Sequence, residues 1–180
     1  MSDFDCDRQA KRDFTASTVS YWKEKGKDTS RLAFWEKTKA GTLVPFDSPD
    51  ADRESRLDVY ICYSAVTDGR LDAVLWWSAE LKERSYPSTA NFFITGGSYL
   101  NTEKIEAMKE EPDYAHIWVE LYSDGKIRLW NLTHIDIGEL PEVWSGIKRY
   151  TVKNGPRIRQ KRRLLPISKA IEIKRERGWS

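Results

Sequence analysis

Two apolar runs dominate the pattern of hydrophobic and polar positions along the chain, residues 57–66 and residues 71–81. Both are rich in β-branched and aromatic residues, and a short polar stretch, Thr-Asp-Gly-Arg at residues 67–70, separates them. This pattern predicts a β-hairpin. Because apolar residues occupy nearly every position, including the adjacent Trp76 and Trp77, we expect the hairpin to be covered on both faces.

The segment before this hairpin predicts a helix and a brief strand. Residues 9–40 contain helix-forming stretches, and Gly41 is a stop signal, so we expect a helix that ends near Ala40. Residues 42–46 form a short apolar burst, and prolines follow among Asp and Ser residues. This composition indicates a brief strand and then a loop that leads into the hairpin.

A helix is predicted after the hairpin, over residues 98–110. Ile105 and Met108 fit one face of this helix, and Glu106 and Lys109 have the spacing of an ion pair on its solvent side. We expect this segment to be a crossover helix between strands.

Two further strands complete the predicted fold. Residues 116–122 and 126–132 are apolar and β-branched, and a Ser-Asp-Gly turn joins them. The order of helices and strands predicts the α/β class, with a central mixed β-sheet flanked by helices.

The composition supports one sizeable core. The chain has 180 residues, and its 8 Trp, 8 Tyr and 6 Phe residues supply aromatic surface for a single domain. With only Cys6 and Cys62, neither a disulfide framework nor a cysteine-rich zinc site is expected. No signal-peptide core and no apolar run of about 18 residues occurs, so we expect a cytoplasmic protein that does not enter a membrane.

Charge is distributed unevenly along the chain. Residues 148–180 carry 12 Lys and Arg and 2 Glu residues, a balance of +10, which leaves 18 basic and 26 acidic residues, or −8, for residues 1–147. We therefore expect an α/β domain over residues 1–147 and a basic C-terminal segment, either a solvated tail or an arm that contacts nucleic acid phosphates. Apolar residues near the end of this segment suggest that it docks back on the same domain.

The hairpin brings an acidic pair and a lysine into one pattern. A three-residue loop at residues 67–69 pairs Asp58 with Ser78 across the strands. Even-numbered side chains of both strands then share one face, so Asp58, Glu80 and Lys82 project to the same side. A tight two-residue Asp-Gly turn instead turns Asp58 to the other face. The sequence leaves both turns open.

Two carboxylates beside an ammonium suit phosphodiester hydrolysis. Asp58 and Glu80 offer the hard oxygen ligands that hold Mg²⁺ or Mn²⁺ at a substrate phosphate. The metal polarises the phosphoryl oxygen and lowers the pKa of a bound water. Lys82 is expected to orient that water or to stabilise the charge that develops in the transition state.

This stretch resembles the core of the PD-(D/E)xK nuclease superfamily, which has an Asp on one strand and (Asp/Glu)-x-Lys on the next. Here these are Asp58 and Glu80-Leu81-Lys82, and the resemblance extends over roughly residues 30–140. The chain is similar to small nuclease-like proteins of phages and bacteria. The resemblance implies a restriction-endonuclease-like core, an endonuclease that hydrolyses DNA with Mg²⁺, and the host cytoplasm for a phage-encoded protein. Many such enzymes use two active sites to cut a duplex, which is compatible with a homodimer.

The resemblance also adds a residue and shows a departure. The first helix of the superfamily frequently supplies another acidic residue, and Glu36 is the matching position for an assisting catalytic role. The Pro that precedes the Asp is absent, and Leu57 stands in its place. Similar triplets, Asp124-Gly125-Lys126 and Glu172-Ile173-Lys174, lie in a predicted turn and in the basic segment, whereas Glu80-Leu81-Lys82 ends an apolar strand.

Basic residues provide the predicted contacts to nucleic acid, and DNA is the nucleic acid that we expect. Arg84, just past the motif strand, is either a solvated charge or a phosphate contact. The other predicted backbone contacts lie in the basic segment: Arg157, Arg159, Lys161, Arg162 and Arg163. Two alternatives to catalysis stay open. One is a nuclease-fold module that binds nucleic acid without cleaving it, and the other is a partner-binding protein whose acidic cluster only stabilises a loop.

Other chemistries have less support in the sequence. His116 and His134 lack the spacing of metal ligands, and Asp72 is expected to flank the hairpin turn. Residues 96–98, Gly-Gly-Ser, lack the Lys of a P-loop and suit a linker before a helix. A G-x-S-x-G nucleophile elbow is also absent.

Overall fold

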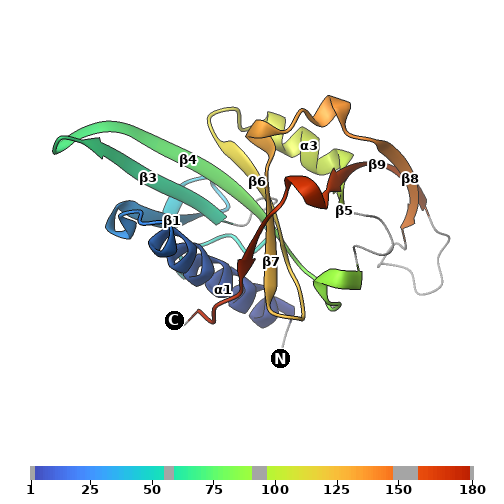
Figure 1. The fold of residues 1–180 in the computed structure, drawn as a ribbon, viewed down its shortest axis with the longest axis horizontal. Coiled ribbons are helices and arrows are strands. Elements are labelled where there is room, and N and C mark those ends of the chain that lie inside the picture. The colour runs from blue at the N-terminus through green and yellow to red at the C-terminus, as the bar shows by residue number, and fades with distance from the viewer. Residues whose placement is uncertain (1–2, 55–58, 91–96, 148–157, 179–180) are drawn as a thin grey trace.

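The computed structural model describes residues 3–54, 59–90, 97–147 and 158–178. Its main element is a seven-stranded sheet with the order β10-β7-β6-β4-β3-β1-β2 (Figure 1). Neighbouring strands are antiparallel except β4 and β6, which are parallel. The strands of this sheet are β1 (Leu32–Lys37), β2 (Leu43–Pro45), β3 (Val59–Thr67), β4 (Arg70–Glu83), β6 (Ala115–Leu121), β7 (Lys126–Asn131) and β10 (Ile171–Lys174).

A second, three-stranded antiparallel sheet has the order β5-β9-β8. Its strands are β5 (Gly97–Asn101), β8 (Glu142–Ile147) and β9 (Ile158–Pro166). The helices are α1 (Asp3–Glu24) and α3 (Thr102–Lys109), with short 3-10 turns at Thr29–Arg31, Leu132–His134, Ile137–Glu139 and Ile167–Lys169. The predicted α/β class with a central mixed sheet is therefore confirmed.

The two faces of the large sheet pack against different partners. On one face, Phe14 of α1 is fully buried in a core with Val59, Ala79, Val119 and other apolar residues of the strands. Because side chains alternate along a strand, Trp118 points to the opposite face, where it packs in a second core with residues of α3 and the small sheet. Figure 1 shows α1 and α3 well apart, with β4, β6 and β7 between them.

The connection from β4 to the parallel β6 contains α3, so the predicted crossover helix is confirmed. Its predicted ion pair is also present, with 3.0 Å between Lys109 Nζ and Glu106 Oε1. The helix begins at Thr102, however, and the preceding residues form β5, which pairs with β9. The sequence pattern missed this strand because its partner lies about 60 positions further along the chain.

The predicted helix ending near Ala40 is wrong. Helix α1 ends at Glu24, and Gly26 follows with a positive φ of 72°. Leu32–Lys37 is a strand that pairs with both β2 and β3. Leu32 and Phe34 contact the α1-side core, because alternate residues of this strand face it. Local helix propensity is overridden here by pairing on both edges.

The hairpin closes with the tighter of the two alternatives. Thr67 pairs with Arg70, and the two residues between them, Asp68 and Gly69, have positive φ angles of 51° and 75°. Such angles are those of a two-residue turn that continues the twist of the strands. Of the two turns that the sequence leaves open, the two-residue turn is the one present.

A β-bulge changes the consequence of this turn. The register shifts between Ala65 and Val66, so that Tyr60, not Asp58, is the partner of Ser78. The predicted pairing of Asp58 with Ser78 is wrong for this reason. The extra residue of the bulge nevertheless returns even-numbered side chains of β3 and β4 to one face. Asp58 itself lies outside the described residues.

The distal half of the hairpin is not covered as predicted. Leu71 is 65% exposed, and Val74 and Leu75 are each 45% exposed. Strand β1 pairs with β3 only as far as Tyr63, and β6 pairs with β4 only from Trp77. Beyond these points the hairpin is a two-stranded ribbon, which projects from the rest of the fold in Figure 1.

The described part of the basic segment is built into both sheets. Strand β9 lies between β5 and β8, and β10 forms the edge of the large sheet beside β7. Leu165 and Ile173 are buried, one in each of the two cores. Among the described residues, no helix has the length and apolarity needed to cross a membrane.

Phe14→Ala tests the packing of α1 on the sheet. We expect the substitution to lower the free energy of unfolding by about 4 kcal/mol, because it leaves a cavity at a fully buried position. Leu71→Ala, on the exposed ribbon, is the matched control and should change it by less than about 0.5 kcal/mol. Urea denaturation measures both, and equal effects would contradict the assigned packing.

Candidate functional site

Glu80 occupies a buried position in the middle of the large sheet. Its strand, β4, lies between β3 and the parallel β6, and the residue is only 2% exposed. Lys82, two residues further on the same face, places Nζ 3.2 Å from Glu80 Oε1. Lys104 of α3 places its Nζ 2.6 Å from the same oxygen. The structure therefore brings together Glu80 and Lys82, as predicted, and adds Lys104.

The second oxygen of this carboxylate has no hydrogen-bond partner within the described ranges. Glu80 Oε2 is buried, and so are the unpartnered Ser78 Oγ and His116 Nδ1. Ser78 of β4 and His116 of β6 are cross-strand partners, two residues along the strands from the pair of Glu80 and Trp118. A buried carboxylate oxygen without a donor is costly unless a proton or a cation satisfies it. As a carboxylate oxygen, Glu80 Oε2 is a ligand that suits a hard metal ion.

Asp58, the other predicted metal ligand, is outside the described residues. It directly precedes Val59 in the sequence, and the cross-strand partner of Val59 is Ala79, the neighbour of Glu80. Within the described residues, no group of three or more His, Cys, Asp or Glu side chains is placed to hold a metal. The predicted ligand pair thus has one described member.

Glu36, the predicted assisting residue, does not join this site. It lies in β1, on the face that packs against α1, where Arg8 Nη1 is 2.8 Å from Oε2 and Lys11 Nζ is 3.1 Å from Oε1. The backbone N–H of Asp47 also donates to Oε2. Glu80 faces the other side of the same sheet. The helical position expected for Glu36 is therefore wrong, and its contacts stabilise the packing of α1.

Tyr60 of β3 lies on the same face of the sheet as Glu80 and contacts another carboxylate, that of Glu111. Its hydroxyl lies 3.0 Å from Glu111 Oε2 and 3.2 Å from Oε1, and Lys37 Nζ lies 2.5 Å from Glu111 Oε1. Burial, then the Glu111 carboxylate, raises the pKa of Tyr60 well above its ordinary value, and Glu80 also contributes. Tyr60 therefore stays a neutral hydrogen-bond donor beside the carboxylates.

A second buried carboxylate, Glu120, lies on the same face as Lys82, its cross-strand partner. Glu120 is fully buried and accepts hydrogen bonds from Arg84 Nη2 at 2.7 Å, Tyr122 OH at 2.6 Å and Ser98 Oγ. Burial by itself raises the pKa of Glu120, but the Arg84 guanidinium and these donors lower it below its ordinary value. Sequence inspection missed this residue because one Glu in an apolar strand does not reveal its partners.

Arg84 is therefore an ion-pair partner first. Burial lowers its pKa, but the Glu120 carboxylate, with Tyr86 and Tyr122, raises it above its ordinary value, so the guanidinium stays charged. Of its nitrogens, Nη2 contacts Glu120, whereas Nε is buried without a hydrogen-bond partner in the described part of the chain. The side chain is 29% exposed. Only part of its donor capacity remains for a phosphate.

The other predicted contacts separate along β9. Lys161 Nζ and Arg163 Nη2 each lie 2.6 Å from a Glu142 oxygen of the adjacent β8. Arg162 instead lies over the Tyr99 ring of β5, at 5.6 Å from its centroid. Burial, and then the nearby Arg84, lower the pKa of Arg162, while Tyr99 opposes this shift. Arg157 and the side chain of Arg159 fall outside the described residues.

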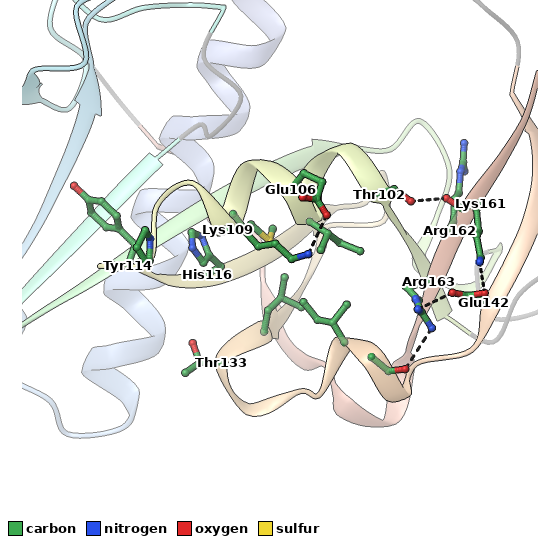
Figure 2. A pocket seen from close by; sticks show the side chains of 16 residues that line it. Thr102, Glu106, Lys109, Tyr114, His116, Thr133, Glu142, Lys161, Arg162 and Arg163 are labelled. Atoms are coloured by element: carbon green, nitrogen blue, oxygen red, sulfur yellow. Dashed lines mark hydrogen bonds and ion pairs between the residues drawn. The ribbon is translucent and has the colours of Figure 1, made fainter.

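A hollow of about 570 Å³ lies on the other side of α3 (Figure 2). Figure 2 shows Glu106 and Lys109 of α3 beside it, His116 and Tyr114 at one end, and the β9 residues at the other. Among its charged side chains, Glu106 pairs with Lys109, and Glu142 pairs with Lys161 and Arg163. Lys104 lies on the opposite side of the helix and contacts Glu80. The hollow is therefore separate from the carboxylate site.

Comparisons with known proteins do not identify a family, so the site is interpreted from its own geometry. A scan of protein-family models and searches of curated proteins and of solved structures found no significant match to this chain.

Glu120→Gln tests the buried ion pair through its pH dependence. Because the folded pKa of Glu120 lies below its ordinary value of 4.5, the ionised form stabilises the fold above that pH. This contribution is lost as pH falls through the folded pKa. We expect the substitution to cost about 3 kcal/mol of unfolding free energy at pH 7, since Arg84 loses its counter-charge.

Urea denaturation at pH 7 and pH 3 measures this effect, and the gap between the two proteins should shrink at the lower pH. Glu106→Gln is the control, because its pair with Lys109 is exposed and contributes less than about 1 kcal/mol. A gap that is unchanged by pH would contradict an ionised Glu120.

Proposed function

We propose that this protein is a metal-dependent nuclease of the PD-(D/E)xK type that hydrolyses DNA phosphodiester bonds. The observation that carries the proposal is the buried carboxylate of Glu80. One of its oxygens is held by Lys82 and Lys104, and the other has no hydrogen-bond partner among the described residues. A carboxylate fixed in this way suits a hard divalent cation at its second oxygen.

The arrangement of elements supports a restriction-endonuclease-like core. The motif strand β4 pairs with β3, the strand that Asp58 precedes, and leads through α3 into the parallel strand β6. The acidic motif is thus at the centre of the sheet, with a helical layer on each side.

Asp58 and Glu80 are the proposed ligands of Mg²⁺ or Mn²⁺, which when bound polarises a phosphoryl oxygen and lowers the pKa of a water molecule. Lys82 lies beside the Glu80 carboxylate, where it orients the attacking water or stabilises developing negative charge. Burial of Glu80 strengthens these electrostatic effects, because water screens them less.

A non-cleaving nucleic-acid-binding module is the second candidate. The observation that favours it is the same pair of lysines. Lys82 and Lys104 already supply positive charge to Glu80, so the site satisfies part of its carboxylate without a metal. Cleavage and binding measured on one set of variants distinguish the two functions.

Glu80→Gln and Lys82→Ala test catalysis. We expect each substitution to slow nicking of plasmid DNA in Mg²⁺ or Mn²⁺ by at least about 100-fold, because each removes a group that acts in the transition state. Glu106→Gln and Lys109→Ala, on the exposed side of α3, are matched controls and should cleave at the wild-type rate. Circular dichroism checks that every variant is folded.

Three outcomes separate the candidates. Loss of nicking in Glu80→Gln and Lys82→Ala alone supports the proposed site. Cleavage that persists in both variants removes Glu80 and Lys82 from the mechanism. A wild-type protein that binds DNA in both metals without cutting plasmid or branched DNA favours the binding module.

The salt dependence of DNA binding tests the predicted phosphate contacts of β9, the basic strand. Arg162→Ala, measured in EDTA so that no cleavage occurs, should reduce the slope of log affinity against log salt by about 0.9, the value for one lost phosphate contact. Arg163→Ala is the matched control, and its slope should change less because Glu142 and the Leu140 carbonyl already bind this guanidinium. Equal slopes for both variants would contradict this division along β9.

A further inference from the structure

Lys104 contacts Glu80 from a different element than the motif lysine does. It lies in the first turn of α3, and its Nζ is 2.6 Å from Glu80 Oε1, closer than Lys82 Nζ at 3.2 Å. Its side chain is 20% exposed, against 34% for that of Lys82. An ammonium that is partly desolvated and in contact with a buried carboxylate is a strong local charge.

The two lysines are held in different ways. Lys82 belongs to the same strand as Glu80, and its ammonium also lies over the ring of Trp118, 6.0 Å from the centroid. Lys104 belongs to a helix whose start is tied to the basic strand, because Thr102 Oγ1 donates to the Lys161 carbonyl at 3.0 Å. Lys104 is therefore held by the helix, and Lys82 by the strand that carries Glu80.

We propose that Lys104 is a phosphate-binding residue of this site, whose ammonium weakens metal binding at Glu80 and binds a substrate phosphate. This inference rests on the proposed function, because it takes Glu80 as a metal ligand. Lys104 acts on the metal as a like charge on the same carboxylate. It acts on DNA as an opposite charge, through contact with a backbone phosphate.

Opposite effects on the two ligands distinguish this role from a structural one. Removing the ammonium takes away repulsion at the metal site, so Lys104→Ala should bind Mn²⁺ at least about tenfold more tightly in the absence of DNA. The same variant should bind duplex DNA at least about fivefold more weakly in Mn²⁺, because it loses a charged phosphate contact. A lysine that only supports the packing of α3 would lower both affinities or neither.

The experiment measures Mn²⁺ binding by isothermal titration calorimetry and DNA binding by fluorescence anisotropy, on a phosphorothioate duplex that resists cleavage. Lys104→Arg keeps the charge and should restore both affinities to near the wild-type values. Lys109→Ala, five residues further along α3 and exposed, should change neither. The double variant Glu80→Gln with Lys104→Ala should lose Mn²⁺ binding, which assigns the metal to Glu80.

The outcomes keep the inference and the proposed function distinct. Mn²⁺ affinity that stays the same or falls in Lys104→Ala overturns the inference, even where the wild type cleaves DNA. A second outcome is that Lys104→Ala shifts the Mn²⁺ and DNA affinities in opposite directions, as expected, but the wild type does not cleave DNA. This outcome overturns the nuclease function and supports the role of Lys104. Absence of Mn²⁺ binding in every variant overturns both.

Discussion

The parallel pairing of β4 with β6 is the constraint on which the rest of this structure depends. It fixes Glu80 opposite Trp118 and Lys82 opposite Glu120. Charged and aromatic side chains therefore share one face of an otherwise apolar pair of strands. Since that face lies under α3 and the small sheet, each carboxylate on it needs its own cations. Lys104 and Lys82 supply them to Glu80, and Arg84 supplies one to Glu120.

The two buried carboxylates differ in how completely they are satisfied. Glu120 accepts hydrogen bonds from one guanidinium and two hydroxyls, so each of its two oxygens has at least one donor. Glu80 has two ammoniums on Oε1 and no hydrogen-bond partner on Oε2 in the described part of the chain. A fully bonded buried carboxylate is typical of a structural network, whereas a half-bonded one indicates a ligand. This contrast is the physical reason why the proposed chemistry rests on Glu80 and not on Glu120.

Charge on the opposite face has a different role. Glu36 pairs with Arg8 and Lys11 of α1, and Asp13 of α1 pairs with Arg175 near the end of the chain. These contacts fasten the N-terminal helix to the sheet and to the C-terminal strand. The seven-stranded sheet thus separates ion pairs that hold the fold together from those that surround the candidate site.

The sequence by itself determined the elements whose signals are local. The hairpin, the crossover helix with its Glu106–Lys109 pair, strands β6 and β7 and the Glu80-Leu81-Lys82 motif all follow from periodicity and turn residues. Only the tertiary structure decided the bulge that sets the hairpin register, the strand conformation around Glu36, and the insertion of β9 between β5 and β8. It alone placed Lys104 on Glu80 and Arg84 on Glu120. These features depend on partners far away in the chain, and a local pattern carries no information about which segments meet.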